Sequence, residues 1–346
     1  MEPPALPRRV TIVDVAQHAQ VSTTTVSKVL RNAYGASPAM RAKVQQAISE
    51  LGYRPNAAAR AMRGQTYTLG VMLPDLRNPF FPEILDGLTE ALRGTEYQVL
   101  VGPGGCNDEQ AESHVTDAMI DRGMDGMILI APISSRSRLE HLANRVPTVI
   151  VGRHGHSAAY DTVSDDDLTG AALVVGHLAG LGHRRIAHIE HAETDPDRLV
   201  EMPNAIRADG YQRAMHAHGL ASEIDIVSTT YTQEGGYVGA RQLLARSRRP
   251  TAIFAGADIV AMGVLDAISE AGLLVPADIS VAGYDNTTFA QLGQISLTSV
   301  DQAGRHIGAE TARLLLDRIA DRHRPSAQIK LSPTLVPRRT TAPPPE

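Results

Sequence analysis

The apolar positions near the start of the chain recur at the spacing of short α-helices. The stretch at about 12–19 opens on Thr11 and Asp14, which resemble a capping box. After a short break, a second stretch at about 23–30 opens behind Ser22, a residue suited to cap a helix. Two short helices that share an apolar seam across a tight turn predict a helix-turn-helix.

A third helix is expected over about 38–51, because two such short helices are not stable in water on their own. Ser37 and Pro38 supply an N-cap followed by proline at the first helical position, and Gly52 ends the stretch. The apolar residues of this helix are expected to cover the seam of the first two.

From Thr68 onward, short apolar runs alternate with stretches of helical period. The expected strands are Leu69–Leu73, Gln98–Val101, Met127–Ile130, Thr148–Val151, Arg185–Ile189, Ile224–Ser228, Ala252–Ala255, Ile279–Ala282 and Leu297–Val300. The expected helices are Pro82–Arg93, Glu109–Arg122, Leu168–Leu181, Ala205–His218, Gly236–Ala245, Ile259–Ala271 and Arg305–Ile319. Strand runs that are apolar throughout are typical of a parallel sheet covered on both faces.

This number of β–α units fits either a closed barrel or two doubly wound lobes. A break in the pattern at about 160–167 divides the units into comparable halves. The late strand and the helix that follows it, at about 297–319, indicate a crossover back to the first half. The pattern therefore favours two doubly wound parallel-sheet lobes behind an all-α helix-turn-helix domain.

Composition is ordinary for a globular protein, with 43% hydrophobic and 21% charged residues among 346. The single cysteine, Cys106, excludes an internal disulfide framework and a Cys-based zinc finger. No apolar run approaches the roughly 18–20 residues of a membrane span, and no apolar run follows the basic pair at the N-terminus. We therefore expect no membrane segment, no secretory signal and a cytoplasmic location.

Charge is distributed unevenly along the chain. Residues 1–65 hold nine Lys/Arg against three Asp/Glu, whereas the remainder holds 24 against 35. The net charge of −5 thus combines +6 at the start with −11 in the body. A basic module on an acidic body predicts that only the module binds an anionic partner. The alternative is that its basic residues form a solvated surface that binds no partner.

The outward face of the second helix carries the candidate DNA contacts. A recognition helix places its N-terminal side chains against base edges in the major groove. Thr23, Thr24 and Lys28 occupy those positions, and threonine and lysine can both bond base edges. The alternative is that these residues only cap and solvate a surface helix.

A short Ala-rich segment from Asn56 to Gly64 follows the three helices. Such a short helix has little stability of its own, so it is expected to order against DNA or a second copy. Met62 lies between Arg60 and Arg63, a pattern that suits an apolar wedge in the minor groove flanked by phosphate contacts. An ordinary linker helix is the alternative.

The sequences VTIVDVAQHAQVSTTTVSKVL at 10–30 and SELGYRPNAAARAMRG at 49–64 closely resemble the head and hinge of the LacI/GalR repressor family. The resemblance continues through NPFF at 78–81, GHRRIA at 182–187 and ISVAGYDNT at 279–287, and covers about 10–340. Two residues depart from the family pattern. Gln20 stands where glycine is usual, so a left-handed backbone there would cost about 1 kcal/mol, and Met62 stands where leucine is usual.

The resemblance implies a homodimeric transcription regulator, most often a repressor, that binds double-stranded operator DNA. It implies a headpiece at 1–54, a hinge at 55–66 and a periplasmic-binding-protein-like core at 67–341. The lobes of that core are expected at about 67–163 with 301–330 and at about 164–300 with 331–341, followed by a Pro-rich tail at 342–346. Beside the base-reading residues, the candidate phosphate contacts are Ser22, Thr25, Asn32 and Ser37, and the candidate minor-groove residues are Asn56, Ala59 and Met62.

A small-molecule effector, a sugar or less readily a nucleoside, is implied in the cleft between the lobes. Ligands of open α/β sheets bind beyond the carboxyl ends of the strands. The candidate effector contacts in those loops are Asn78, Phe80, Phe81, Arg207, Tyr231, Asp258 and Asp285. Arg207 and Tyr231 match family positions for an effector arginine and a stacking aromatic, whereas Ala257 stands where a polar residue is common.

Signals for enzymatic or metal chemistry are weak. Gly102–Gly105 follows a strand but does not match a phosphate-binding loop, and no nucleotide or hydrolase motif occurs. The pairs His154/His156 and His188/His191 lack cysteines at zinc spacing and favour loop or surface histidines. Asp165–Asp167 favours a helix cap over a cation site, so no cofactor or metal is expected.

Two rival functions remain at this point. A solute-binding protein of a transport system would share the clamp fold but would need an export signal and no basic head. A sugar-converting enzyme would need a nucleophile, base or phosphate loop, and none is assembled in the sequence. The Pro-rich tail lacks heptads, so a dimer is expected rather than a helix-zippered tetramer.

Overall fold

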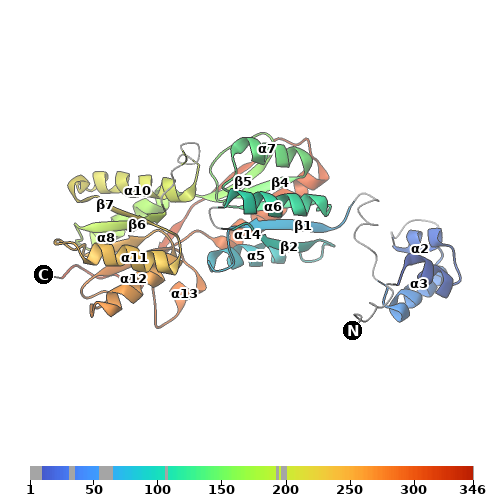
Figure 1. Cartoon of the computed structure of the whole chain (residues 1–346), viewed down its shortest axis with the longest axis horizontal. Coiled ribbons are helices and arrows are strands. Elements are labelled where there is room, and N and C mark those ends of the chain that lie inside the picture. Colours follow the sequence, from blue (N-terminus) through green and yellow to red (C-terminus); the bar gives the residue numbers. More distant parts are fainter. Residues whose placement is uncertain are drawn as a thin grey trace, which may run out of the picture. The chain divides into compact units, whose positions relative to one another are not determined.

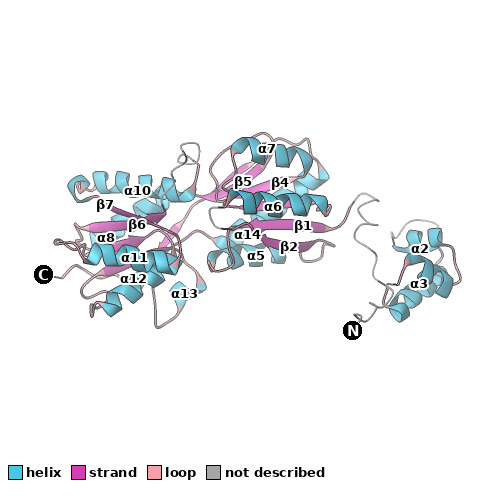
Figure 2. Ribbon diagram, in the orientation of Figure 1, coloured by secondary structure: helices cyan, strands magenta, loops and turns pink. Residues whose placement is uncertain are grey.

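The computed structural model of the chain describes residues 10–30, 36–53, 65–105, 108–191, 195 and 201–345. The chain divides into two compact units, Met1–Thr66 and Tyr67–Glu346, which are described separately. Figure 1 follows the chain by colour and Figure 2 by element type.

The first unit contains the three predicted helices: α1 (Ile12–His18), α2 (Thr23–Leu30) and α3 (Pro38–Leu51). The capping box of α1 is confirmed, because Thr11 accepts from the Asp14 amide and the Asp14 carboxylate accepts from the Thr11 amide at 2.7 Å. Apolar side chains of all three helices form one core, and the fully buried ones are Val15, Val26 and Val44. Each helix thus covers the seam of the other two.

Gln20 has a φ of 55°, in the left-handed region, as expected if the turn keeps its usual geometry. Because this region favours glycine, the turn between α1 and α2 is strained by about 1 kcal/mol. Gly52 takes the same conformation at the end of α3, with a φ of 59°, and there the absence of a side chain removes the strain.

The second unit contains two six-stranded sheets with helices on both faces (Figure 2). The first sheet has the order β11-β5-β4-β3-β1-β2 and is parallel throughout. Its strands are β1 (Thr68–Leu73), β2 (Gln98–Pro103), β3 (Gly126–Ile130), β4 (Thr148–Val151), β5 (Asp161–Asp165) and β11 (Gln328–Leu331). One apolar core lies under α5 (Phe80–Ala91) and α14 (Gly304–Ala320), and another under α6 (Glu109–Asp121) and α7 (Arg136–Arg145).

The second sheet has the order β12-β10-β9-β8-β6-β7, with only β12 antiparallel. Its strands are β6 (Ile186–His191), β7 (Asp225–Thr229), β8 (Ala252–Ala255), β9 (Ser280–Asp285), β10 (Thr298–Asp301) and β12 (Thr334–Val336). Helices α8 (Asp167–Gly180) and α10 (Pro203–Ala217) cover one face, and α11 (Gln233–Leu244) and α12 (Asp258–Glu270) cover the other. The short elements η1 (Ala221–Glu223) and α13 (Thr288–Gln291) complete this lobe.

The chain passes between the two sheets after β5, after β10 and after β11. The two-lobed parallel architecture favoured over the barrel is therefore the observed one. The expected division at about 160–167 is confirmed, since the chain leaves the first sheet directly after β5, but residues 161–165 form a fully buried strand where no strand was predicted. Strand β5 has a polar sequence, so its hydrophobic pattern does not predict a buried strand. The burial of Asp161 is compensated by the guanidinium groups of Arg318 and Arg324, which bond its carboxylate at 2.7–3.0 Å.

Within the described residues, no helix has both the length and the apolar character needed to cross a membrane.

Candidate functional site

The exposed side of α2 presents the predicted base-reading residues. Thr23, Thr24 and Lys28 are all exposed, whereas Val26 and Val29 of the same helix are buried. This division follows from the helical period, which places the two valines against α1 and α3. The three polar side chains therefore lie on a surface that a duplex could approach.

The candidate phosphate contacts partly serve as helix caps. The Ser22 hydroxyl accepts from the Thr25 amide at 3.1 Å and lies 2.9 Å from the Thr25 hydroxyl, while Ser37 accepts from the Met40 amide at 3.3 Å. Ser22 and Ser37 are exposed, so each can also reach an external oxygen. Asn32, Asn56, Ala59 and Met62 lie outside the described residues.

A cavity of about 340 Å³ lies between the two lobes of the second unit. It opens at the carboxyl ends of strands from both sheets, as the general rule for α/β ligand sites predicts. Its wall includes residues that end or directly follow eight strands, namely Pro74, Ala131, Gly152, Asp165, His191, Thr230, Asp285 and Gln302. Six of the seven predicted effector residues line it: Asn78, Phe80, Phe81, Arg207, Tyr231 and Asp285.

Asp258 is the exception, because it does not line the cavity. Its Oδ2 accepts from the amide and hydroxyl of Thr287 at 2.7 and 2.9 Å, and its Oδ1 accepts from the Ser299 hydroxyl at 2.6 Å. The expectation of an effector contact is corrected accordingly: this fully buried carboxylate connects α12 with the loop after β9 and with strand β10. Burial raises its pKa to about 6, against the lowering effect of these bonds.

Arg207, on α10, is 4% exposed, and three of the five N–H groups of its guanidinium donate within the protein. Nε and Nη2 donate to Asp167 Oδ1 at 3.0 and 2.6 Å, and Nη1 donates to the Gly256 carbonyl. The guanidinium carbon lies 3.6 Å from the centre of the Tyr284 ring. Asp167 in turn bonds His154 Nε2 at 2.8 Å, so the arginine at the cavity wall is connected to the loop after β4.

Two carboxyl groups of the cavity wall are electrostatically perturbed. Burial raises the pKa of Asp285 well above its usual range, and Asp258 adds to the shift. Burial and the nearby Asp167 raise the pKa of Asp165 to about 7. Asp165 accepts from the Tyr284 hydroxyl at 2.7 Å, whereas Asp285 Oδ2 is buried without a hydrogen-bond partner among the described residues.

The aromatic side chains of the wall come from α5 and from the loop after β7. Phe80 is nearly buried and contacts Phe81 with ring centres 6.5 Å apart. Tyr231 stacks obliquely against His191 at 5.7 Å, and its hydroxyl is buried without a partner among the described residues. Burial raises the pKa of Tyr231 to about 12, so it remains a neutral hydrogen-bonding group.

Among the polar wall residues that sequence reasoning missed are Asp165, His191, Asn204 and Gln302. Asp165 ends β5, a strand that had been interpreted as a break, and Gln302 lies in the crossover after β10. His191 ends β6, and Asn204 donates to the His191 carbonyl at 2.7 Å. The rule that ligands bind beyond strand ends would have found Asp165, His191 and Gln302, whereas nothing in the local pattern marks Asn204.

The histidine and aspartate clusters serve structural roles. His188 was expected in a loop or on the surface but is fully buried in β6, stacked between Tyr211 and Phe254, and burial lowers its pKa to about 3. Asp166 caps α8 through the Thr169 amide, as predicted. Within the part of the chain that the structure describes, no group of three or more His, Cys, Asp or Glu residues could hold a metal.

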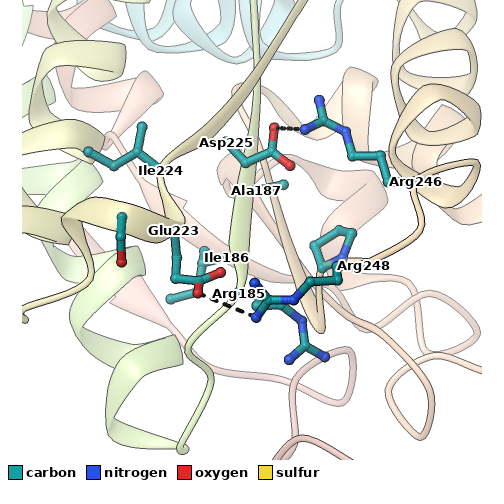
Figure 3. A pocket seen from close by; sticks show the side chains of 10 residues that line it. Arg185, Ile186, Ala187, Glu223, Ile224, Asp225, Arg246 and Arg248 are labelled. Atoms are coloured by element: carbon teal, nitrogen blue, oxygen red, sulfur yellow. Dashed lines mark hydrogen bonds and ion pairs between the residues drawn. The ribbon is translucent and has the colours of Figure 1, made fainter.

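A second pocket lies at the opposite, amino-terminal ends of β6 and β7 (Figure 3). Arg246 pairs with Asp225 at 2.6 Å and Arg248 with Glu223 at 3.4 Å. The third arginine, Arg185, donates to the Arg249 carbonyl at 2.9 Å. This pocket lies at the strand ends opposite to those where ligands of open α/β sheets bind. The interlobe cavity is therefore the candidate effector site.

Two family models match the chain. The one described as "Bacterial regulatory proteins, lacI family" matches residues 11–56, and the one described as "Periplasmic binding protein-like domain" matches residues 175–341. The HTH-type transcriptional repressor PurR of Erwinia tasmaniensis is 34% identical over 338 residues, which cover 96% of this chain and 97% of that protein. The chain belongs to the LacI family.

Solved structures of LacI-family proteins resemble the chain as well. The lac repressor dimer bound to operator and the anti-inducer ONPF has a TM-score of 0.81 at 26% identity, covering 97% of this chain and all of that one. A LacI-family regulator from Enterococcus faecium with bound ribose has a TM-score of 0.70 at 28% identity, covering 80% and 99%. The chain is thus a DNA-binding helix-turn-helix regulator with a periplasmic-binding-protein-like core.

Proposed function

We propose that this protein is a homodimeric, cytoplasmic repressor without enzymatic activity, whose affinity for operator DNA is set by a small sugar-like effector. The observation that carries the proposal is the pairing of an exposed polar recognition helix with a cavity between two lobes in one chain. The relatives named above are repressors, and one neighbour holds ribose. The helix-turn-helix domain distinguishes this chain from a solute-binding protein of a transport system.

DNA recognition is assigned to α2. Lys28 can donate to guanine O6 and N7, and the threonines can bond base edges or contact a thymine methyl group. Thr23 and Thr24 lie at the amino-terminal end of α2, the end that a recognition helix directs at the bases. Ser22, Thr25, Asn32 and Ser37 are proposed to hold phosphates, and Asn56, Ala59 and Met62 to enter the minor groove.

An effector is proposed to bind Asn78, Phe80, Phe81, Arg207, Tyr231 and Asp285 in the interlobe cavity. Hydroxyl groups of a ring would donate to Asp285 and bond Tyr231, while the aromatic side chains would cover the apolar face of the ring. Pockets of this kind, with a few polar groups in an apolar wall, are typical of small-molecule sites. A volume of about 340 Å³ accommodates a ligand of sugar size.

Dimerisation is supported by apolar side chains that the described part of the chain leaves exposed. Phe289 and Leu292 are 42% and 52% exposed beside a groove lined by Ile259, Met262 and Leu265 of α12. On the other lobe, Leu100 and Val101 of the edge strand β2 are 49% and 41% exposed. Large exposed apolar patches rimmed by polar residues are typical of protein interfaces.

Effector binding is proposed to change the arrangement of the lobes and thereby the positions of the two DNA-binding domains. A coupling of about 1–3 kcal/mol would change operator affinity by roughly 5–150-fold. Because the basic domain would release counterions from DNA, binding is expected to weaken steeply with salt.

The test is selection of a duplex from a random library with the full-length protein, followed by gel-shift titration at several salt concentrations. Lys28→Ala should weaken binding to the selected duplex at least tenfold, whereas Lys43→Ala, on the exposed face of α3, should change it less than threefold. Failure to select any duplex, or an affinity that salt leaves unchanged, would refute the proposed function.

A further inference from the structure

A buried ion pair joins the two lobes of the second unit. Arg153 lies in the loop after β4, in the lobe of the first sheet, and Glu201 lies shortly before α10, in the lobe of the second sheet. Arg153 Nε donates to Glu201 Oε2 at 2.7 Å, and Arg136 of α7 lies 3.9 Å from Oε1. The side chains of Arg153 and Glu201 are 2% and 13% exposed, so water and salt screen their attraction little.

Backbone carbonyl groups fix Arg153 within its own lobe. Its Nη1 donates to the carbonyl of Ser134 at 2.6 Å and to that of Pro132 at 3.4 Å. The loop that carries these carbonyls is itself fixed to α6, because the amides of Ile133 and Ser134 donate to the carboxylate of Glu112 at 2.8 and 3.0 Å. The guanidinium of Arg153 therefore meets the second lobe from a fixed position.

A backbone hydrogen bond between the lobes runs beside the ion pair. The amide of His154 donates to the carbonyl of Glu201 at 2.8 Å. The segment of Arg153 and His154 is thus bonded to Glu201 by a side chain and by the backbone. The chain itself crosses between the lobes after β5, after β10 and after β11, so these bonds join the lobes at a further place.

Gly155 leaves the space that the Glu201 carboxylate occupies. A Cβ atom at position 155 would lie 2.5 Å from the carboxyl carbon of Glu201 and 2.6 and 2.7 Å from its two oxygens. Non-bonded carbon atoms are in favourable contact only at about 3.5–4.0 Å, so any other residue here would displace the carboxylate from Arg153. Gly155 is not among the glycines with positive φ, so the position requires glycine for space and not for its backbone torsion.

The ion pair adjoins the interlobe cavity on both lobes. Gly152 and Met202, the chain neighbours of Arg153 and Glu201, line the cavity, whereas the two charged residues are not among its lining residues. Gly152 and Met202 belong to different lobes, so the width of the cavity between them depends on how the lobes are held at this edge. The Arg153–Glu201 bond lies directly behind both of them in the chain and holds that edge together.

We propose that Arg153 and Glu201 are positioning residues that form a latch, which fixes the two lobes relative to each other and so the width of the cavity at this edge. This inference rests on the proposed function in that it takes the interlobe cavity as the effector site. Movement of the lobes apart at this edge would separate the two charges, so the latch favours the arrangement in which they meet. Without the latch, only a fraction of the molecules would have the cavity width that an effector requires, and the apparent affinity would fall by that fraction.

The experiment measures the distance between the lobes by pulsed electron paramagnetic resonance on the full-length protein without effector. Spin labels are attached at His114→Cys on α6 and Gln212→Cys on α10, exposed positions of the two lobes (Figure 1), in a Cys106→Ser background. Coexpression with an excess of the cysteine-free chain isolates the label pair of a single chain. Arg153→Met should at least double the width of the distance distribution or move its mean by more than about 2 Å.

Gly155→Ala breaks the latch in a second way, because it retains both charges and adds one methyl group that displaces the Glu201 carboxylate. It should change the distance distribution as Arg153→Met does, and the two substitutions together should change it no further, since both break the same bond. Gly180→Ala in α8 is the matched control, because a Cβ atom there meets no atom within 4 Å.

The control variant should leave the distribution unchanged. A distribution that neither Arg153→Met nor Gly155→Ala alters, with native circular dichroism in both, would overturn the proposal. An equal change in Gly180→Ala would overturn it as well.

The DNA-binding function is measured separately on the same samples. Gel shift of the protein with an intact latch on the selected duplex reports whether it is a DNA-binding regulator. Latch-dependent lobe distances in a protein that binds no duplex would refute the regulator alone. Normal DNA binding together with lobe distances that do not depend on Arg153 or Gly155 would refute the latch alone.

Discussion

Two arginines of helix α10 pair with aspartates, Arg207 with Asp167 of α8 and Arg213 with Asp209 of α10, and the difference in their burial predicts very different energetic roles. Arg207 and Asp167 are 4% and 0% exposed, with N–H···O bonds of 3.0 and 2.6 Å. Arg213 and Asp209, one and a half turns further along, are 70% and 47% exposed and form a bond of 2.7 Å. Asp167→Asn and Asp209→Asn therefore make the same chemical change in opposite environments.

Asp167→Asn should lower the free energy of unfolding by about 3–5 kcal/mol, because it removes the carboxylate that accepts two N–H groups of the buried Arg207 guanidinium. The true value should lie near the lower limit, since the amide oxygen can still accept one N–H group. Asp209→Asn should cost no more than about 0.5 kcal/mol, because water screens the exposed pair. The predicted difference between the two variants is thus at least about 2.5 kcal/mol.

Urea denaturation of the full-length protein, followed by far-ultraviolet circular dichroism, measures both values. The chain has no tryptophan, so backbone ellipticity is the natural signal. The double variant Asp167→Asn with Arg207→Met should regain part of the lost stability, since it removes the unpaired charge. A loss below about 1 kcal/mol in Asp167→Asn, or equal losses in the two single variants, would refute this account of the buried pair.

Three further predictions concern the rest of the molecule. Asp161→Asn should destabilise the second unit by about 3 kcal/mol in the same urea assay, because Arg318 is buried against that carboxylate, and a loss within error of zero would contradict this. The pKa of Asp165 is raised to about 7 by burial, so the folded state binds a proton that the unfolded state has lost. Stability should accordingly fall as pH rises from about 4 to 7, and this fall should be smaller in Asp165→Asn, a result that melting at several pH values would check. Leu292→Glu, in the exposed groove beside α12, should convert a dimer to a monomer in analytical ultracentrifugation, and an unchanged mass would exclude this groove from the interface.

Local patterns were sufficient to predict the first unit and most strands and helices of the second. The three short helices begin and end within about one residue of the predicted bounds, because caps and proline mark their ends. The buried strands Thr148–Val151 and Ala252–Ala255 were found because they are apolar throughout. Helix α7 and strands β11 and β12 were not found, since they are partly polar and short.

For the effector cavity, the sequence indicated which loops surround it but not which side chains of those loops face it. Asp258 and Asp285 both adjoin a strand end in the sequence and cannot be told apart there. In the folded chain, Asp258 turns toward Thr287 and Ser299, while the positive φ of Asp285 keeps its carboxyl at the cavity wall. Which carboxylate meets a ligand thus depends on backbone torsions and on partners far along the chain.

The sequence by itself determined the order of elements, the basic helix-turn-helix and the doubly wound character of the body, because periodicity, caps and charge are local properties. The tertiary structure decided where charge is compensated. Strand β5 is buried because Arg318 and Arg324 reach Asp161 from residues more than a hundred positions away. Arg207 likewise pairs with Asp167, which lies 40 positions earlier in the chain. Such pairing depends on distances in space, which a sequence pattern does not contain.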